Sequence, residues 1–293
     1  MAYSIETEKR VWAPEGETKA VVQVIHGMAE HIDRYEPMAK HLNARGIAVV
    51  GINLRGHGKN AAIKGYFADR NGWDTLIEDH HTLTGEIRAR FPGVPLALLG
   101  HSMGSFLARE YAIRYSREID MLILSGTGHY GKALTTVGIL IAKMSPKKKP
   151  ANFVNGIAFT GNNKPFKPAR TDFDWLSRDE KKVDGYVADE LCGFTFTGSA
   201  FADFFGGLRA LCNTKRLQAV RKDLPVLMIS GTADPVGQMG EGVKITDKEF
   251  RDAGVKKVTV CLYPDARHEL FSETNREEVL NALEKDILET LCE

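Results

Sequence analysis

The sequence has few cysteines and no long apolar run, and each absence excludes a class of protein. The four cysteines are scattered through 293 residues without CxxC or metal-ligand spacing, which argues against a disulfide framework and favours reduced thiols. No apolar run approaches the roughly 18 residues of a membrane-spanning helix. The N-terminal stretch MAYSIETEKRVWAPEG is charged and lacks the apolar centre of a signal peptide. We therefore expect a cytoplasmic protein without stable membrane insertion.

Net charge is also nearly absent. The chain has 39 Lys and Arg against 38 Asp and Glu, so its formal net charge is +1, which argues against a nucleic-acid partner. The one basic run, residues 147–149, lies between two prolines, and we interpret it as a solvated loop rather than a contact with anionic lipid. The apolar stretch TTVGILIAKM before it leaves a transient contact with a lipid surface open, but core packing is the favoured interpretation.

Apolar runs of strand type alternate with helical patterns in the first 128 residues and again after residue 222. This alternation is typical of an α/β fold, a mostly parallel sheet with helices on both faces. Between the two parts the strand pattern stops, and short helical patterns and loops replace it. We predict a core of residues 1–128 and 223–293 with a mainly helical lid inserted at 129–222. The strand candidates are VVQVI (21–25), IAVVGINL (47–54), LALLG (96–100), MLILSG (121–126), PVLMISG (225–231) and VTVCLYP (258–264).

The stretch GHSMG, residues 100–104, follows a predicted strand and precedes a predicted helix. A nucleophile elbow requires this setting, because its serine must project above the sheet from a strained turn. Gly100 and Gly104 satisfy the need for small residues where neighbouring backbone passes close by. The alternative is a glycine-rich turn in which Ser102 only caps the following helix.

A serine nucleophile needs a base and an orienting acid, and two later stretches supply both. Asp234 follows a predicted strand in SGTADPVG, and His268 follows the next strand in YPDARHEL. Each alone fits an ordinary loop residue, but the order Ser, Asp, His after three strand ends is that of a catalytic triad. Asp265 is a rival acid that we rank below Asp234, because it lies in the same turn as the histidine.

The third requirement is a pair of backbone N–H groups for the oxyanion of the tetrahedral intermediate. Met103, directly after the serine, supplies one donor, and Met28 in the loop after the first strand supplies the other. His26 in that loop resembles a second base, but we expect it to order the loop by hydrogen bonding. This chemistry needs no metal and no organic cofactor.

On these motifs the chain resembles the lidded α/β-hydrolases that include monoacylglycerol lipases, lysophospholipases and serine aminopeptidase-like hydrolases. The resemblance implies the α/β-hydrolase fold, the same triad and the same oxyanion donors, with Glu30, His31 and Arg34 organising the loop. The family usually has Asp and Ser where this chain has Asn53 and Asn60, so local loop hydrogen bonding is expected to differ. The motifs are HGMAEHIDRYEPMAKHL (26–42), LRGHG (54–58), GHSMG, SGTADPVG (230–237) and YPDARHEL (263–270).

Aromatic side chains gather in the predicted lid. They suggest either the wall of an acyl pocket or a lid that packs on itself, and burying an acyl chain against them would contribute roughly 0.8 kcal/mol per CH₂. The tentative substrate-binding residues are Trp175, Phe194, Phe196, Phe201, Phe204 and Phe205.

Together these features predict a serine hydrolase that cleaves carboxylic esters through an acyl-enzyme, of the monoacylglycerol lipase or lysophospholipase type, acting on a small ester or lipid. An aminopeptidase of the same fold is the alternative, and it requires an acidic subsite in the lid for the substrate ammonium. A non-catalytic binding protein is disfavoured, because no member of the triad is missing. The acidic lid candidates are Asp172, Asp174, Asp179, Asp184, Asp189 and Glu190.

Overall fold

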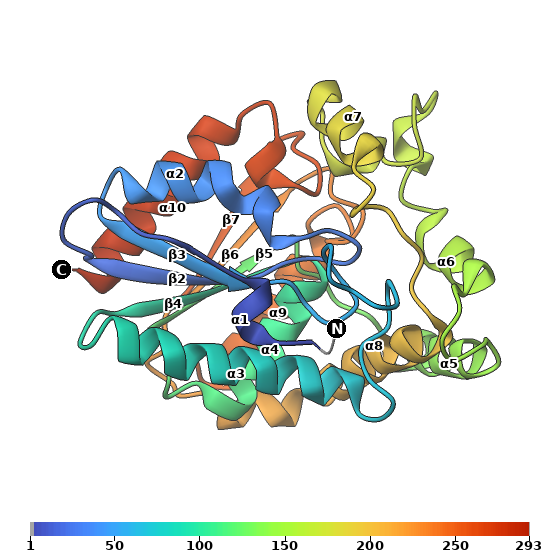
Figure 1. Cartoon of the computed structure of the whole chain (residues 1–293), viewed down its shortest axis with the longest axis horizontal. Coiled ribbons are helices and arrows are strands. Elements are labelled where there is room, and N and C mark those ends of the chain that lie inside the picture. Colours follow the sequence, from blue (N-terminus) through green and yellow to red (C-terminus); the bar gives the residue numbers. More distant parts are fainter. Residues whose placement is uncertain (1–2, 293) are drawn as a thin grey trace.

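A seven-stranded sheet forms the centre of the computed structural model, which describes residues 3–292 (Figure 1). The strand order is β1-β3-β2-β4-β5-β6-β7, and every neighbouring pair is parallel except β1 with β3. The predicted α/β class is therefore confirmed. The strands are β1 (Lys9–Trp12), β2 (Ala20–Ile25), β3 (Ile47–Ile52), β4 (Leu96–His101), β5 (Met121–Ser125), β6 (Val226–Gly231) and β7 (Val258–Tyr263).

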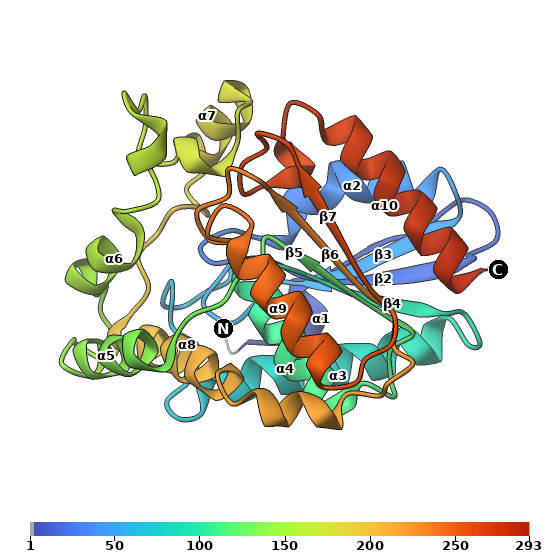
Figure 2. The same ribbon diagram turned by 180° about the vertical axis from the view of Figure 1, so that it is seen from behind.

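Helices cover both faces of the sheet (Figures 1 and 2). Residues of β2 to β6 are buried throughout, as their continuous apolar runs require in a sheet covered on both sides. Two separate apolar cores result, one on each face. One face carries α2 (Glu36–Asn43) and α10 (Arg276–Leu291), and the other carries α3 (Gly72–Arg90), α4 (Met103–Tyr115) and α9 (Glu241–Asp252).

The edge strand β1 was not predicted. It follows the short helix α1 (Ile5–Glu8) and pairs antiparallel with β3, with Lys9 opposite Ile52 and Trp12 opposite Val49. All four of its residues are only half-buried. A short strand at the edge of a sheet needs no apolar run, so the sequence carries little signal for it.

The segment between β5 and β6 lies at one end of the sheet, beyond the carboxyl ends of the strands (Figure 1). We call residues 129–222 the candidate lid. In the sheet of an α/β fold this edge is where ligands bind. The candidate lid contains α5 (Lys132–Lys143), α6 (Asn152–Phe159), η2 (Lys164–Phe166), η3 (Asp174–Leu176), α7 (Glu180–Ala188), α8 (Gly198–Leu211) and η4 (Thr214–Ala219).

The core-packing interpretation of TTVGILIAKM is wrong for most of its large side chains. Val137, Leu140 and Met144 are 51%, 59% and 86% exposed. Helix α5 packs one face on α8 and buries only Thr135 and Ala142. Nothing in the described chain covers its other face. No helix within residues 3–292 is both long and apolar enough to cross a membrane.

Candidate active site

Ser102 occupies a strained turn between β4 and α4. Its φ and ψ are 53° and −121°, and its backbone N–H donates to the Ser125 carbonyl at 2.9 Å. A Cβ on Gly104 would lie 2.0 Å from the Ile25 carbonyl oxygen, and one on Gly100 would lie 2.2 Å from that of Gly104. The glycines are therefore steric requirements of the turn. The Ser102 side chain makes no capping hydrogen bond, so the structure contradicts the alternative of a helix cap.

Asp234 and His268 form a buried pair. His268 Nδ1 donates to Asp234 Oδ1 at 2.9 Å, and the same carboxylate accepts from the Val236 N–H at 2.8 Å and the Ser230 hydroxyl at 3.2 Å. Burial raises the pKa of Asp234, but the imidazole of His268 and the backbone N–H groups of Val236 and Gly237 outweigh it, and the pKa is lowered. The carboxylate therefore stays ionised. The rival acid Asp265 is exposed and its backbone N–H donates to a hydroxyl elsewhere, so Asp234 is the partner.

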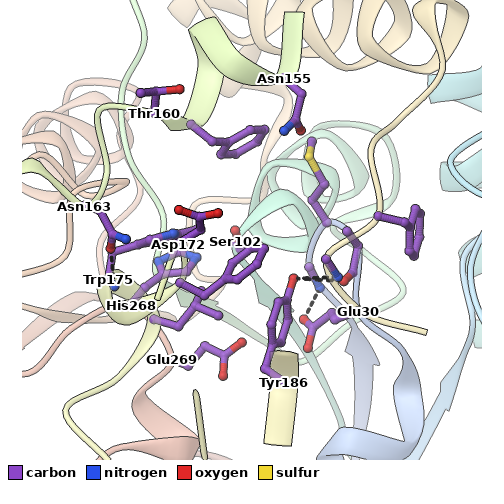
Figure 3. A pocket seen from close by; sticks show the side chains of 18 of the residues that line it. Glu30, Ser102, Asn155, Thr160, Asn163, Asp172, Trp175, Tyr186, His268 and Glu269 are labelled. Carbon is purple, nitrogen blue, oxygen red and sulfur yellow. Dashed lines mark hydrogen bonds between the residues drawn. The ribbon is translucent and has the colours of Figure 1, made fainter. Parts of the chain in front are cut away.

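His268 and Ser102 line the same cavity (Figure 3). His268 Nε2 is buried and has no hydrogen-bond partner among the described residues. Trp175 from the candidate lid lies against the imidazole of His268, with ring centroids 5.0 Å apart. The ring centroid of His101 lies 4.8 Å from that of His268. Packing thus orients the imidazole, while Nε2 remains available as a proton acceptor.

The loop after β2 is ordered by side chains that hydrogen-bond its backbone. Glu30 accepts from the Gly27 N–H at 2.5 Å. His26 is buried, donates through Nδ1 to the Gly27 carbonyl at 2.8 Å, and accepts through Nε2 from the Leu54 N–H at 2.9 Å. Both ring nitrogens are occupied, which confirms the ordering role predicted for His26. Burial lowers the pKa of His26 to about 3, so the ring stays neutral.

The two proposed oxyanion donors lie in the loop after β2 and at the start of α4. Met28 lines the cavity, and Met103 is the first residue of the helix, where backbone N–H groups have no intrahelical acceptor. The hydrogen bonds within residues 3–292 leave both N–H groups without an acceptor. Two backbone donors without an acceptor, one in the loop after β2 and one at the start of the helix after Ser102, are what an oxyanion hole requires.

A buried cluster of charged side chains joins the loop after β2 to the loop after β7, which carries His268 and which we call the histidine loop. Arg34 donates through Nη1 to Glu30 at 2.6 Å and through both Nη atoms to Glu269 at 2.7 and 2.6 Å. Tyr35 adds a hydroxyl donor to Glu30 at 2.9 Å. The candidate lid is also connected to the loop after β2, because the Tyr186 hydroxyl donates to the Ala29 carbonyl at 3.0 Å. The predicted organising role of Glu30 and Arg34 therefore has a direct structural basis.

The cavity at this site has a volume of about 510 Å³. Ser102, His268 and the loop after β2 form its floor, and the candidate lid forms its walls (Figure 3). The candidate lid contributes both apolar and polar side chains, so the cavity suits an acyl chain next to a polar group. The lining side chains from the lid include Asn155, Phe159, Thr160, Asn163, Asp172, Phe173, Trp175, Leu176, Tyr186 and Phe194.

Only part of the predicted aromatic wall lines this cavity. Trp175 and Phe194 do, as predicted. The other four, Phe196, Phe201, Phe204 and Phe205, do not, and the structure corrects their assignment to substrate binding. They pack on one another and against side chains of the core. Phe159, Phe173 and Tyr186 were missed, because single aromatics in loops and short helices carry no periodic signal.

The two departures from the family pattern share one partner. Asn53 Nδ2 and Asn60 Nδ2 each donate to Glu8 at 2.8 Å, one to each carboxylate oxygen. Asn53 also accepts from the Ile32 N–H at 2.9 Å. An aspartate at position 53 would place a second carboxylate against Glu8. In this chain both asparagines therefore tie the loop to Glu8 at the end of α1.

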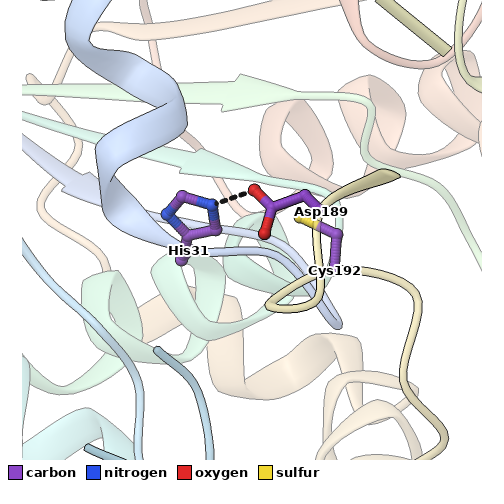
Figure 4. A group of neighbouring side chains, drawn as sticks. All are labelled: His31, Asp189 and Cys192. Carbon is purple, nitrogen blue, oxygen red and sulfur yellow. Dashed lines mark hydrogen bonds and ion pairs between the residues drawn. The ribbon is translucent and has the colours of Figure 1, made fainter. Parts of the chain in front are cut away.

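One group of possible metal ligands occurs in the described chain, where His31, Asp189 and Cys192 lie within 4.8 Å of one another (Figure 4). His31 Nε2 already hydrogen-bonds Asp189 Oδ2 at 2.8 Å. Burial raises the pKa of the Cys192 thiol, which keeps it protonated and makes it a poor metal ligand. We interpret the group as a tie between the loop after β2 and the candidate lid.

Comparison with protein families matches residues 16–275 to the family described as serine aminopeptidase, S33. A monoacylglycerol lipase of Mycolicibacterium smegmatis is 28% identical, over 92% of this chain and 89% of that protein. A monoglyceride lipase of Rattus norvegicus is also 28% identical, over 90% of this chain and 80% of that protein. Among solved structures, a thermostable carboxyl esterase from Bacillus coagulans in complex with glycerol superposes with a TM-score of 0.90 at 27% identity, covering 97% of this chain and 94% of that one.

Proposed function

The chain belongs to the serine aminopeptidase S33 family of hydrolases, and from this premise we propose that it is a serine ester hydrolase of the monoacylglycerol lipase type. Ser102 is the nucleophile, His268 the general base and Asp234 the orienting acid. The observation that carries the proposal is the buried Asp234–His268 pair at 2.9 Å, with Nε2 unpartnered and the strained Ser102 lining the same cavity as His268. The named relatives support an ester as the substrate.

The reaction follows from this geometry. His268 Nε2 takes the hydroxyl proton as Ser102 Oγ bonds to the ester carbonyl carbon, and the N–H groups of Met28 and Met103 hold the oxyanion. When the intermediate collapses, the ester C–O bond breaks and Nε2–H protonates the leaving alcohol. Water then gives a proton to His268 and attacks the acyl-enzyme. Collapse of the second intermediate releases the acid and returns the proton to Ser102.

Residues 129–222 act as a lid that shapes the substrate cavity. The apolar side chains Phe159, Phe173 and Leu176 suit an acyl chain, and each buried CH₂ contributes roughly 0.8 kcal/mol. Polar groups at Asn155 and Thr160 suit a small polar head group such as glycerol. Lysophospholipids, which add a charged head group to the same acyl ester, form the second substrate class that we expect.

Replacing Ser102 by Ala tests the proposal. We expect hydrolysis of a monoacylglycerol and of p-nitrophenyl butyrate to fall at least about 10³-fold, with the fold and unfolding free energy retained. Ser145→Ala, in the lid but outside the cavity lining, is the matched control and should leave hydrolysis within about twofold. A fluorophosphonate should label wild type and Ser145→Ala but not Ser102→Ala. Activity or labelling that survives in Ser102→Ala contradicts the triad.

An aminopeptidase remains the second candidate because of one acidic side chain. Of the six acidic lid residues predicted for an ammonium subsite, Asp172 alone lines the cavity. Asp174 accepts local hydrogen bonds, while Asp184 and Asp189 pair with Arg170 and His31. Hydrolysis of an aminoacyl-anilide that exceeds that of the acyl ester, and that is lost in Asp172→Asn, would favour the aminopeptidase.

A further inference from the structure

None of the residues in the motif LRGHG, residues 54–58, lines the cavity, yet this stretch is hydrogen-bonded to the loop after β2. Two hydrogen bonds cross between the two loops, and each joins a histidine of one loop to a backbone N–H of the other. The Leu54 N–H donates to His26 Nε2 at 2.9 Å, and the Ala29 N–H donates to His57 Nε2 at 3.2 Å. The two imidazole rings lie 5.0 Å apart, edge to face. The motif therefore supports the loop that carries the first proposed oxyanion donor.

His57 is held as a neutral hydrogen-bond acceptor. Its Nδ1 donates to the Arg55 carbonyl at 3.0 Å, which leaves the lone pair of Nε2 for the Ala29 N–H. Burial lowers the pKa of His57 to about 3, so the ring is uncharged at neutral pH. The flanking glycines, Gly56 and Gly58, have φ values of 75° and 72°, and a Cβ on either would overlap a neighbouring atom. Both glycines are therefore required to place this ring.

Ala29 has a strained backbone. Its φ is 52°, in the left-handed region that residues with a Cβ rarely adopt. Its carbonyl accepts from the Tyr186 hydroxyl at 3.0 Å and from the Gly193 N–H at 2.9 Å, both in the candidate lid. Its N–H is bonded to His57, so both backbone polar groups are held from outside the loop. Such contacts keep a residue in a conformation that it would otherwise leave.

The peptides next to Met28 are fixed in the same way. The Gly27 N–H donates to Glu30, and the Gly27 carbonyl accepts from His26 Nδ1. That carbonyl and the Met28 N–H belong to one planar trans peptide, so they point in opposite directions. The next N–H along the chain is the one that His57 accepts. Of these three successive N–H groups, only the middle one, that of Met28, has no acceptor among the described residues.

We propose that His57 is a positioning residue of the oxyanion hole: by accepting the Ala29 N–H, it keeps Ala29 in the left-handed conformation and so fixes the direction of the Met28 N–H. Negative charge develops on the carbonyl oxygen only as the tetrahedral intermediate forms. A donor fixed toward that oxygen therefore stabilises the transition state more than the bound ester. The use of Met28 rests on the proposed function, whereas the contact that fixes the loop does not.

Two substitutions of His57 separate its hydrogen bond from the packing of its ring. His57→Phe keeps a planar ring without an acceptor, and His57→Gln keeps an acceptor oxygen without the ring. On p-nitrophenyl butyrate we expect kcat to fall at least about tenfold in His57→Phe, with KM within about twofold, and His57→Gln to recover most of this loss. The Ki of butylboronic acid, whose tetrahedral adduct with Ser102 carries an oxygen in the oxyanion hole, should rise about tenfold in His57→Phe. Equal kcat in the wild type and His57→Phe, or a loss in KM alone, would overturn the proposal.

His80→Phe is the matched control. His80 is also buried and burial lowers its pKa to about 3, but it lies on α3 and its ring contacts Gln23 in β2 rather than the loop that follows. The same substitution there should leave kcat on p-nitrophenyl butyrate within about twofold. Equal losses of kcat in His57→Phe and His80→Phe would mean that any change in the buried core has this effect, which would contradict a positioning role.

Relief of the strain at Ala29 provides an independent test. In Ala29→Gly the left-handed conformation no longer carries a steric penalty, so the loop depends less on His57. We expect His57→Phe to lower kcat no more than about threefold when it is added to Ala29→Gly and compared with that single variant. A loss of tenfold or more in both backgrounds would contradict the view that His57 acts by holding Ala29.

Amide hydrogen exchange tests the contact without turnover. In the Ser102→Ala background, exchange of the Ala29 N–H, followed by NMR, should be at least about tenfold faster with His57→Phe and unchanged with His80→Phe. Unchanged exchange with His57→Phe would overturn the proposal even if the wild type hydrolyses esters. A wild type that does not hydrolyse p-nitrophenyl butyrate would contradict the esterase instead, and the exchange rate would still decide whether His57 fixes the loop.

Discussion

The carboxylate of Glu269 forms a bidentate ion pair with the guanidinium of Arg34, with Nη1–Oε1 and Nη2–Oε2 distances of 2.7 and 2.6 Å. Glu269 directly follows His268, and Arg34 also holds Glu30, which fixes the Gly27 N–H beside the proposed oxyanion donor. The two loops that must approach one substrate from different strands are therefore joined by one cation. All three charged side chains are largely buried, so their pairing is needed to offset desolvation.

Replacing Arg34 by Gln should leave two buried carboxylates without their cation. We expect the free energy of unfolding to fall by about 3–5 kcal/mol, measured by urea denaturation, since removal of one partner of a buried ion pair typically costs this much. Adding Glu269→Gln to that variant should restore part of the loss, because one uncompensated charge is then removed. A single variant as stable as wild type would show that the cluster is not a structural tie.

Asp234 sets the pH dependence that we expect for hydrolysis. Burial lowers the pKa of His268, but the charge and hydrogen bond of Asp234 outweigh it, and the pKa is raised above its usual 6.5. The general base must be neutral, so kcat/KM should decrease as the pH falls through this raised value. In Asp234→Asn the acid limb should move to lower pH, and kcat should fall by about 10³–10⁴-fold because the imidazole tautomer is no longer fixed.

The measurement is the pH profile of kcat/KM on p-nitrophenyl butyrate. Asp265→Asn, which changes the exposed rival carboxylate in the same histidine loop, is the control and should leave the limb in place. An acid limb that shifts equally in both variants would mean that Asp234 is not the specific partner of His268.

The shared partner of Asn53 and Asn60 allows a stability prediction. Asn53→Asp should destabilise the fold by about 2–4 kcal/mol at neutral pH, because it places a second carboxylate against Glu8 where both side chains are buried. Asn60→Asp makes the same chemical change at an exposed position and should cost less than about 1 kcal/mol. Glu8→Gln should rescue Asn53→Asp in a double-mutant cycle. Equal costs at the two positions would contradict this account.

The proximity of the three proposed triad residues was predictable, because it follows from the topology of the sheet. The carboxyl ends of parallel strands meet at one edge of the sheet, so Ser102, Asp234 and His268 had to come close once each was placed after a strand. The glycines around Ser102 added a steric requirement that can be seen in the sequence. The strand ends alone place the three residues, so the prediction did not depend on the structure of the chain between them.

The role of each lid aromatic was not predictable in this way. Phe194 and Phe196 are two residues apart and chemically identical, yet the first lines the cavity and the second packs against Phe67. The difference depends on which surface of the core the lid meets, and local periodicity does not contain that information. Helix α5 is a second example. The sequence pattern of its apolar stripe is the same whether another helix packs on the stripe or the stripe is exposed, as it is here.

Four buried histidines provide a prediction on acid stability. Burial is the main cause that lowers the pKa of His26, His57 and His80 to about 3 and that of His101 to about 4, against 6.5 for an ordinary histidine. Between these values the unfolded chain binds protons that the folded chain does not. Stability is therefore fully present above about pH 6.5 and is lost as the pH falls toward 4, by about 1.4 kcal/mol per pH unit for each histidine.

His80 is suited to a test because it lies on α3, away from the cavity lining, and its Nε2 has no hydrogen-bond partner among residues 3–292. Urea denaturation between pH 7 and 4.5 should show the unfolding free energy decreasing steeply in wild type. His80→Gln should reduce that slope by about 1.4 kcal/mol per pH unit.

His81→Gln, at the neighbouring half-exposed position, should leave the slope almost unchanged. The raised pKa of His268 opposes the loss in part but is common to all three proteins, so the difference in slope isolates His80. Identical slopes in the wild type and His80→Gln would mean that this histidine is protonated in the folded protein.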